Sequence, residues 1–170
     1  MTSDIHEVYL NLGSNIQPEA NLVKAIQLLQ EYGNVQKVSS AWESKSVGMD
    51  GPNYLNSCIL LATDYEQASL KERVIRPIET QLGRKRSENK YTPRTIDIDT
   101  ILFDEERCNQ RLWEFVFIIV PLAEIYPLYQ DPITNEFITQ TAARLRSEVW
   151  IKRRPEVLSQ LSWNRFKGQN

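Results

Sequence analysis

The alternation of apolar and polar residues predicts four strands and two helices in the first 103 residues. Strand composition, either alternating or continuously apolar, occurs in four segments: residues 7–12, 35–42, 54–63 and 95–103. Apolar residues recur at helical spacing in two segments: residues 18–31 and 64–82. Pro77 lies inside the second of these helices and predicts a kink or a new start there.

The order of these elements is βαββαβ, which predicts an α+β fold. We expect a ferredoxin-like core, with an antiparallel sheet and helices packed on one face. Residues 115–120 are strongly apolar and predict a further strand, followed by a single helical turn at 121–127 between two prolines. Residues 137–146 fit a short helix, and a last strand is possible after residue 149. The chain has no linker or repeat, so we expect one domain over residues 1–170, with about 150–170 as a C-terminal extension.

Two aspartates interrupt the apolar strand at residues 95–103. Successive side chains of a strand alternate between faces, so Asp97 and Asp99 point the same way and Ile98 points the opposite way. Neighbouring carboxylates repel one another unless a cation lies between them. Mg²⁺ is typically held by one or two carboxylates together with substrate phosphates. The alternative is a solvated strand face whose charges pair with nearby arginines.

Arginines close before the aspartate pair favour a phosphate ligand. Guanidinium groups match phosphate oxygens in a bidentate geometry. The chain places three of them in the polar loop and turn that lead into the strand: Arg84, Arg86 and Arg94.

Composition excludes several other classes of protein. The net charge of −2 gives no basic excess for a nucleic-acid backbone, and no apolar run is long enough to span a membrane. Cys58 and Cys108 form no Cys-x-x-Cys pair or disulfide framework, which predicts a cytoplasmic protein. His6 is the only histidine, so a histidine metal site or a Ser-His-Asp triad is not expected. Near a terminus, His6 is expected to be solvated.

Four sequence segments resemble one enzyme family. They are LGSN at 12–15, PNYLN at 52–56, GRKR at 83–86 with PRTIDID at 93–99, and VPLAEIYP at 120–127. In this order and near this spacing, the chain resembles a divergent member of the 6-hydroxymethyl-7,8-dihydropterin pyrophosphokinase family over about residues 8–127.

The resemblance implies an Mg²⁺-dependent enzyme of folate biosynthesis. It would transfer pyrophosphate from ATP, its co-substrate, to 6-hydroxymethyl-7,8-dihydropterin, giving AMP and the pterin diphosphate. Two Mg²⁺ ions would be held by Asp97 and Asp99. Dihydropteroate synthase would be the pathway neighbour, with physical association left open.

The resemblance also assigns roles to individual residues. The catalytic set would be Arg84, Arg94, Asp97 and Asp99. The ATP-binding set would be Glu79, Arg84, Arg86, Arg94 and Ile98. The pterin-binding set would be Ser44, Val47, Tyr54, Asn56 and Phe117. Tyr91 matches an aromatic residue in a mobile lid.

The sequence departs from the family after Phe103, where the connection is short. Asn109 stands where the family has histidine, and Phe115 stands where it has arginine. Arg111 is the candidate to replace the missing arginine. Since one charged contact is worth a few kcal/mol at most, we expect weakened ATP binding rather than inactivity. The alternative is a catalytically weak or inactive relative that binds a pterin or nucleotide.

Overall fold

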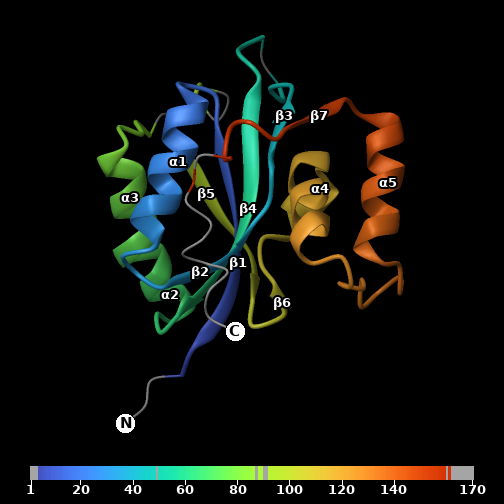
Figure 1. The fold of residues 1–170 in the computed structure, drawn as a ribbon, viewed down its shortest axis with the longest axis horizontal. Helices are drawn as coiled ribbons and strands as arrows, with labels where there is room; N and C mark the ends of the chain where they lie inside the picture. Colours follow the sequence, from blue (N-terminus) through green and yellow to red (C-terminus); the bar gives the residue numbers. More distant parts are fainter. Residues whose placement is uncertain (1–3, 49, 87, 90–91, 160, 162–170) are drawn as a thin grey trace.

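Within the residues that the structure describes, seven strands form one antiparallel sheet (Figure 1). The computed structural model describes residues 4–48, 50–86, 88–89, 92–159 and 161 of the 170-residue chain. The strands are β1 (His6–Ser14), β2 (Asn34–Val38), β3 (Ala41–Ser44), β4 (Tyr54–Thr63), β5 (Asp97–Phe103), β6 (Glu106–Arg107) and β7 (Ile151–Arg154). Their order is β6-β5-β1-β4-β3-β7, and β2 also pairs with β4. The predicted α+β class and βαββαβ core are confirmed.

The two helices of the predicted core lie on one face of the sheet, as expected. They are α1 (Pro18–Leu29) and a second helix in three continuous parts: α2 (Gln67–Leu70), a π-helical turn (Lys71–Ile75) and α3 (Arg76–Gln81). Pro77 lacks an N–H and its ring would crowd the carbonyl four residues earlier, so the wider turn just before it accommodates the predicted irregularity. The buried face of these helices packs on alternate residues of β1 and β4, such as Leu10 and Ile59.

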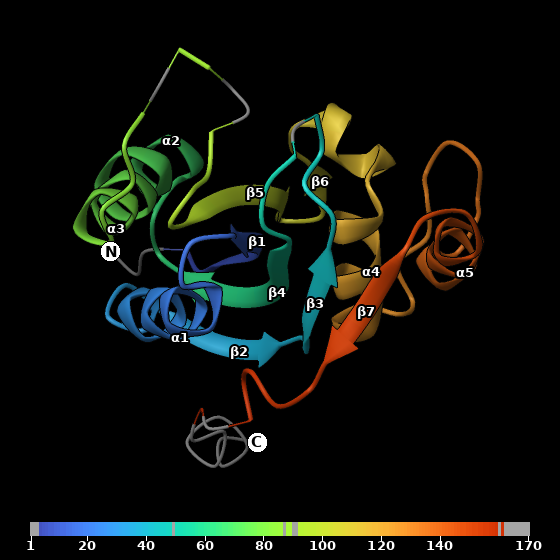
Figure 2. The ribbon, with the colours of Figure 1, turned by 90° about the horizontal axis from the view of Figure 1, so that it is seen from above.

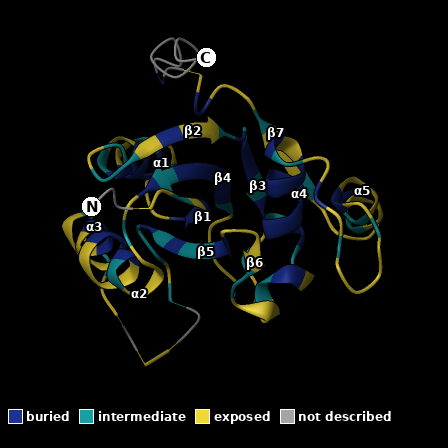
Figure 3. Ribbon diagram, turned by 90° about the horizontal axis from the view of Figure 1, so that it is seen from below, coloured by how far each residue is buried: buried dark blue, intermediate teal, exposed yellow. Residues whose placement is uncertain are grey.

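The opposite face of the sheet is covered by α4 (Val116–Ile125), and α5 (Ile138–Glu148) packs on the outer side of α4, as Figure 2 shows. The predicted strand at residues 115–120 is therefore wrong, and the single turn predicted at 121–127 is largely the second half of α4. A short run that is apolar throughout cannot distinguish a buried strand from a buried helix. α4 is apolar except for Glu124 because it lies between the sheet and α5, and Figure 3 shows most of it buried.

The single strand predicted at residues 35–42 is divided into β2 and β3, which both pair with β4. The division falls at Ser39, whose hydroxyl accepts a hydrogen bond from the Cys58 N–H over 2.9 Å. The Ser39 N–H in turn donates to the Cys58 carbonyl over 2.8 Å. The side chain thus takes the place of a backbone acceptor where the two strands are interrupted.

The segment after α5 joins the same core. β7 pairs with β3, and beyond it Val157, Leu158 and Leu161 are buried in the cluster beneath α1. Glu124 of α4 accepts hydrogen bonds from Ser40 and from the Trp42 indole N–H. These bonds hold α4 against the start of β3. No helix in the described part of the chain is long and apolar enough to cross a membrane.

Candidate active site

Two cavities meet at β5. The first, of about 400 Å³, lies between the sheet and the start of α4, and we call it the aromatic cavity after Tyr54, Phe115 and Phe117 in its wall. The second, of about 410 Å³, lies beside α2, α3 and β5. We call it the basic cavity after four cationic residues that line it: Lys71, Arg76, Arg84 and Arg86. Three residues line both cavities: Asp97, Asp99 and Asn109. The predicted aspartate pair therefore stands on the boundary between two chemically different spaces.

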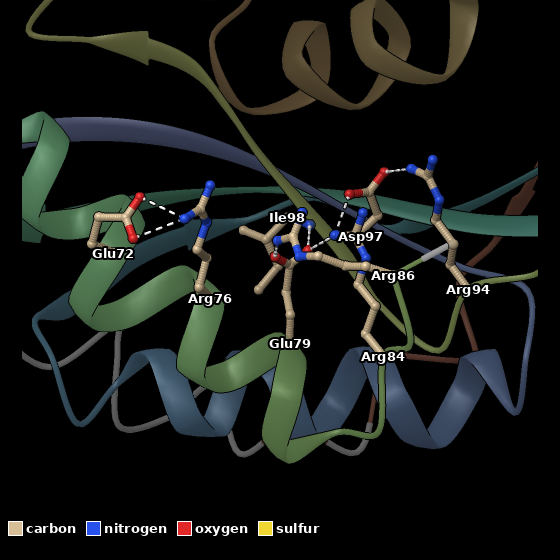
Figure 4. Close-up of polar contacts among 8 residues, drawn as sticks. All are labelled: Glu72, Arg76, Glu79, Arg84, Arg86, Arg94, Asp97 and Ile98. Carbon is tan, nitrogen blue, oxygen red and sulfur yellow. Dashed lines mark hydrogen bonds and ion pairs between the residues drawn. The ribbon is translucent and has the colours of Figure 1, made fainter. Parts of the chain in front are cut away.

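Asp97 is held between two arginines, as Figure 4 shows. Arg84 Nη1 donates to Asp97 Oδ1 over 2.9 Å, and Arg94 Nη1 donates to Oδ2 over 2.5 Å. Arg94 is itself positioned by the turn before β5, because its backbone N–H donates to Asn15 Oδ1 over 2.8 Å. Each carboxylate oxygen of Asp97 thus has a guanidinium partner, which fixes its orientation at the boundary of the cavities.

Glu79 forms the buried base of the basic cavity. Its side chain is 4% exposed and accepts hydrogen bonds from Arg84 and, over 3.2 Å, from the Ile98 backbone N–H. Arg86 lies 3.4 Å from the other carboxylate oxygen, with most of its own side chain in solvent. Burial raises the pKa of Glu79, and the nearby Arg84 charge opposes that shift. Four of the five predicted ATP-site residues therefore line the basic cavity: Glu79, Arg84, Arg86 and Ile98. The fifth, Arg94, lines the aromatic cavity and is joined to Arg84 through Asp97.

Asp99 lies near two other carboxylates, Asp97 and Glu79, and near the charges of Arg84 and Arg94. Burial raises its pKa to about 7, and the charges of Asp97 and Glu79 add to the increase. A carboxylate that is costly to ionise beside another carboxylate is a suitable ligand for a hard divalent cation. Among the described residues, no third Asp, Glu, His or Cys joins them as a three-ligand group. The pair fits Mg²⁺ that takes its remaining ligands from phosphate and water.

All five predicted pterin-site residues line the aromatic cavity: Ser44, Val47, Tyr54, Asn56 and Phe117. Asn56 Nδ2 donates to Ser44 Oγ over 2.9 Å, so both polar side chains are oriented before any ligand arrives. Gly13 lies opposite Asn56 on β1, and a Cβ atom at Gly13 would lie only 3.0 Å from Asn56 Oδ1. The glycine of the LGSN segment therefore leaves room for the Asn56 carboxamide.

The positions that depart from the family also lie in the site. Phe115 stacks on Phe117 with ring centroids 4.9 Å apart, and Asn109 contacts both cavities. Arg111 lines the aromatic cavity, which places it on the side of the aspartate pair that holds Phe115. Tyr91 is outside the described residues.

Sequence reasoning missed several wall residues. Lys71 and Arg76 line the basic cavity, but their helical positions alone did not distinguish them from solvated residues. Asn11 lines the aromatic cavity from the middle of β1. Its signal was present in the sequence, since it is a polar residue between Leu10 and Leu12 in an otherwise apolar strand.

The chain is thus an antiparallel α+β domain of the class that carries a carboxylate pair between a basic and an aromatic cavity. The model of the 7,8-dihydro-6-hydroxymethylpterin-pyrophosphokinase (HPPK) family matches residues 9–127, and the chain belongs to this family.

Named relatives agree with this assignment. The chain is 34% identical over 149 residues to the 2-amino-4-hydroxy-6-hydroxymethyldihydropteridine pyrophosphokinase of Bacillus subtilis, covering 81% of this chain and 88% of that protein. It is 33% identical over 141 residues to the enzyme of the same name from Aquifex aeolicus, covering 74% and 87%.

A solved structure of Plasmodium falciparum HPPK-DHPS, with pterin and p-hydroxybenzoate, shares the fold. Its TM-score is 0.68 at 13% identity, covering 89% of this chain and 47% of that one. The chain thus spans about half the length of this larger protein.

Proposed function

We propose that this protein transfers pyrophosphate from ATP to the hydroxymethyl group of 6-hydroxymethyl-7,8-dihydropterin, giving AMP and the pterin diphosphate in folate biosynthesis. The observation that carries the proposal is the meeting of the basic and aromatic cavities at Asp97 and Asp99. The substrate oxygen would attack the β-phosphorus, and the bond from that phosphorus to the α,β-bridging oxygen would break with release of the alcohol proton. Such a transfer requires both substrates to be held at one boundary.

The basic cavity suits the triphosphate of ATP. Arg84 and Arg94 are held by Asp97, and their charge would stabilise the negative charge that develops on the bridging oxygen. Arg76 and Arg86 line the basic cavity together with Arg84, whereas Arg94 reaches Asp97 from the aromatic cavity. Glu79 would contribute indirectly, because it holds Arg84 and the backbone of Ile98 in place.

The aromatic cavity suits a flat, hydrogen-bonding ring. Tyr54 and Phe117 supply aromatic faces, and Asn56 and Ser44 supply oriented polar groups. Val47 lies at its exposed rim, with 54% of its surface in solvent. We propose that Tyr91 acts as a lid residue and helps to exclude water from the site.

Asp97 and Asp99 would hold the metal, for which we propose two Mg²⁺ ions. When bound, Mg²⁺ polarises phosphoryl oxygens and neutralises their charge. The residues of the chain would position the metal ligands. Arg84 and Arg94 keep the Asp97 carboxylate in one orientation, and the half-buried Asp99 lines both cavities beside it.

Arg111 and Asn109 would modify rather than abolish this function. Arg111 offers a guanidinium in the aromatic cavity near Phe115, which stands where the family has arginine. We propose that it supplies part of the missing charge. The second candidate function is that of a weak relative that binds the ligands without turnover. It is favoured by Asn109 and Phe115, which stand where the family has histidine and arginine.

The deciding experiment measures AMP when the protein is mixed with Mg²⁺, ATP and 6-hydroxymethyl-7,8-dihydropterin. The proposal predicts equimolar AMP and pterin diphosphate, and no AMP after chelation of Mg²⁺. Saturable binding of either substrate without AMP would support the weak relative, and neither binding nor AMP would refute both. The cysteine pattern supports placing the reaction in the cytoplasm, where dihydropteroate synthase would use the product.

A further inference from the structure

Asn11 is a buried polar residue whose hydrogen-bonding capacity is not met within the protein. It is 4% exposed and lies on β1, in the wall of the aromatic cavity. Its Oδ1 atom is buried and has no hydrogen-bond partner. Among the described residues, Thr95 Oγ1 is the other buried side-chain atom in this condition, and Thr95 does not line the cavity. Buried polar side chains are nearly always paired, so a carboxamide without a protein partner in the wall of a cavity is a candidate ligand contact.

The register of the sheet places Asn11 at the end of the cavity nearest the aspartates. Asn11 pairs with Asp99 of β5 on one side and with Cys58 of β4 on the other. Gly13, two residues further along the same face, pairs with Asp97 and Asn56. Asn56 therefore lines the part of the cavity near Tyr54. Asn11 lies further back along β1, beside Asp99.

We propose that the Asn11 carboxamide binds the hydroxyl group of the acceptor alcohol and so selects a hydroxymethyl ligand over one that lacks the hydroxyl. Because Oδ1 is closed off by the protein, the ligand hydroxyl would meet the amide nitrogen of Asn11 and accept a hydrogen bond from it. The inference rests on the proposed function, since the attacking oxygen must lie against the aspartate pair. It makes Asn11 a specificity-determining residue, distinct from the groups that recognise the ring.

A binding comparison tests the proposal without turnover. Isothermal titration calorimetry with Mg²⁺ and a non-cleavable ATP analogue would compare 6-hydroxymethylpterin with 6-methylpterin. For the unaltered protein we expect the hydroxymethyl compound to bind about tenfold more tightly, the effect of one net hydrogen bond. In Asn11→Leu and Asn11→Ala the preference is expected to fall to about one. In the matched variant Asn56→Ala, both ligands should weaken together with the preference retained.

Thermal unfolding separates this role from a structural one. Asn11→Leu is nearly equal in size and removes an unpaired polar atom, so its melting temperature should be unchanged or higher. The proposal is overturned if either Asn11 variant keeps the full preference, or if the variants lose stability and weaken both ligands equally. Equal binding of the two pterins by the unaltered protein would overturn this inference alone. If neither pterin binds, the proposed function fails as well.

Discussion

Arg94 and Asp97 lie three residues apart and form a hydrogen-bonded ion pair of 2.5 Å between Nη1 and Oδ2. The pair closes the turn that leads from the basic loop into β5. With Arg84 on the other oxygen, it fixes one carboxylate of the aspartate pair before any ligand binds. The site is thus stabilised by ion pairs between arginines and carboxylates, and substitution of these residues should change the stability of the protein.

Replacing Arg84 with alanine should destabilise the fold. The Arg84 side chain is 13% exposed and neutralises Glu79, which is 4% exposed, together with Asp97. Its loss leaves a buried carboxylate poorly compensated, at a cost of about 3 kcal/mol in the free energy of unfolding measured in urea. Arg86→Ala is the matched control, because Arg86 is 61% exposed and should cost less than about 1 kcal/mol. Equal losses in the two variants would refute the buried pair as the stabilising contact.

Phe117→Ala should affect one substrate only. Phe117 lines the aromatic cavity and stacks on Phe115, whereas the basic cavity does not include it. Loss of an aromatic contact worth about 2 kcal/mol predicts a rise of about thirtyfold in KM for the pterin, with KM for ATP nearly unchanged. Phe137→Ala, at an exposed position outside both cavities, should change neither constant. A parallel rise in both KM values would contradict separate cavities.

His6 is less solvated than its position near the terminus suggested. Its side chain is 12% exposed, with Nδ1 2.5 Å from Asp104 Oδ2 and Nε2 3.3 Å from Glu66 Oε1. The hydrogen bond to Asp104 raises the pKa of His6 above its ordinary value of 6.5. The same bond lowers the pKa of Asp104 below 3.8. The pair thus links the first strand to the turn after β5.

These shifts predict a pH window for stability. A raised histidine pKa stabilises the fold fully below 6.5, and this contribution is lost as the pH rises through the folded-state pKa. The lowered Asp104 pKa gives stability above 3.8 that is lost as the pH falls through its folded-state value. The difference in unfolding free energy between the unaltered protein and His6→Gln should therefore be largest between about pH 4 and 6, and shrink as the pH rises through the raised folded-state pKa of His6. A difference that does not vary with pH would contradict the charged pair.

The sequence predicted the parts of the fold that depend on local pattern. The alternation in β1, the mostly apolar run in β4, the helical spacing in α1 and the common face of Asp97 and Asp99 were each sufficient to place these elements. The arginines were correctly associated with the aspartates because they lie close in sequence, so short-range chain geometry brings them together.

Other features depended on contacts that no local pattern records. Residues 116–120 belong to a helix whose outer face is covered by α5, and α5 begins only at Ile138. His6 is paired because β1 and β5 are adjacent, which brings Asp104 beside it. The unmet hydrogen bond of Asn11 becomes evident only when Asp99 and the cavity are placed around it.

The central claim is that Asp97 and Asp99 form the reaction centre where the two cavities meet, and AMP release tests it most directly. With Mg²⁺, ATP and 6-hydroxymethyl-7,8-dihydropterin, Asp97→Ala and Asp99→Ala should each lower AMP formation by about 10³-fold or more while the circular dichroism spectrum is retained. Asp64→Ala, at an exposed position beyond β4, is the matched control and should keep full activity. Normal AMP formation by both Asp97→Ala and Asp99→Ala would contradict the account.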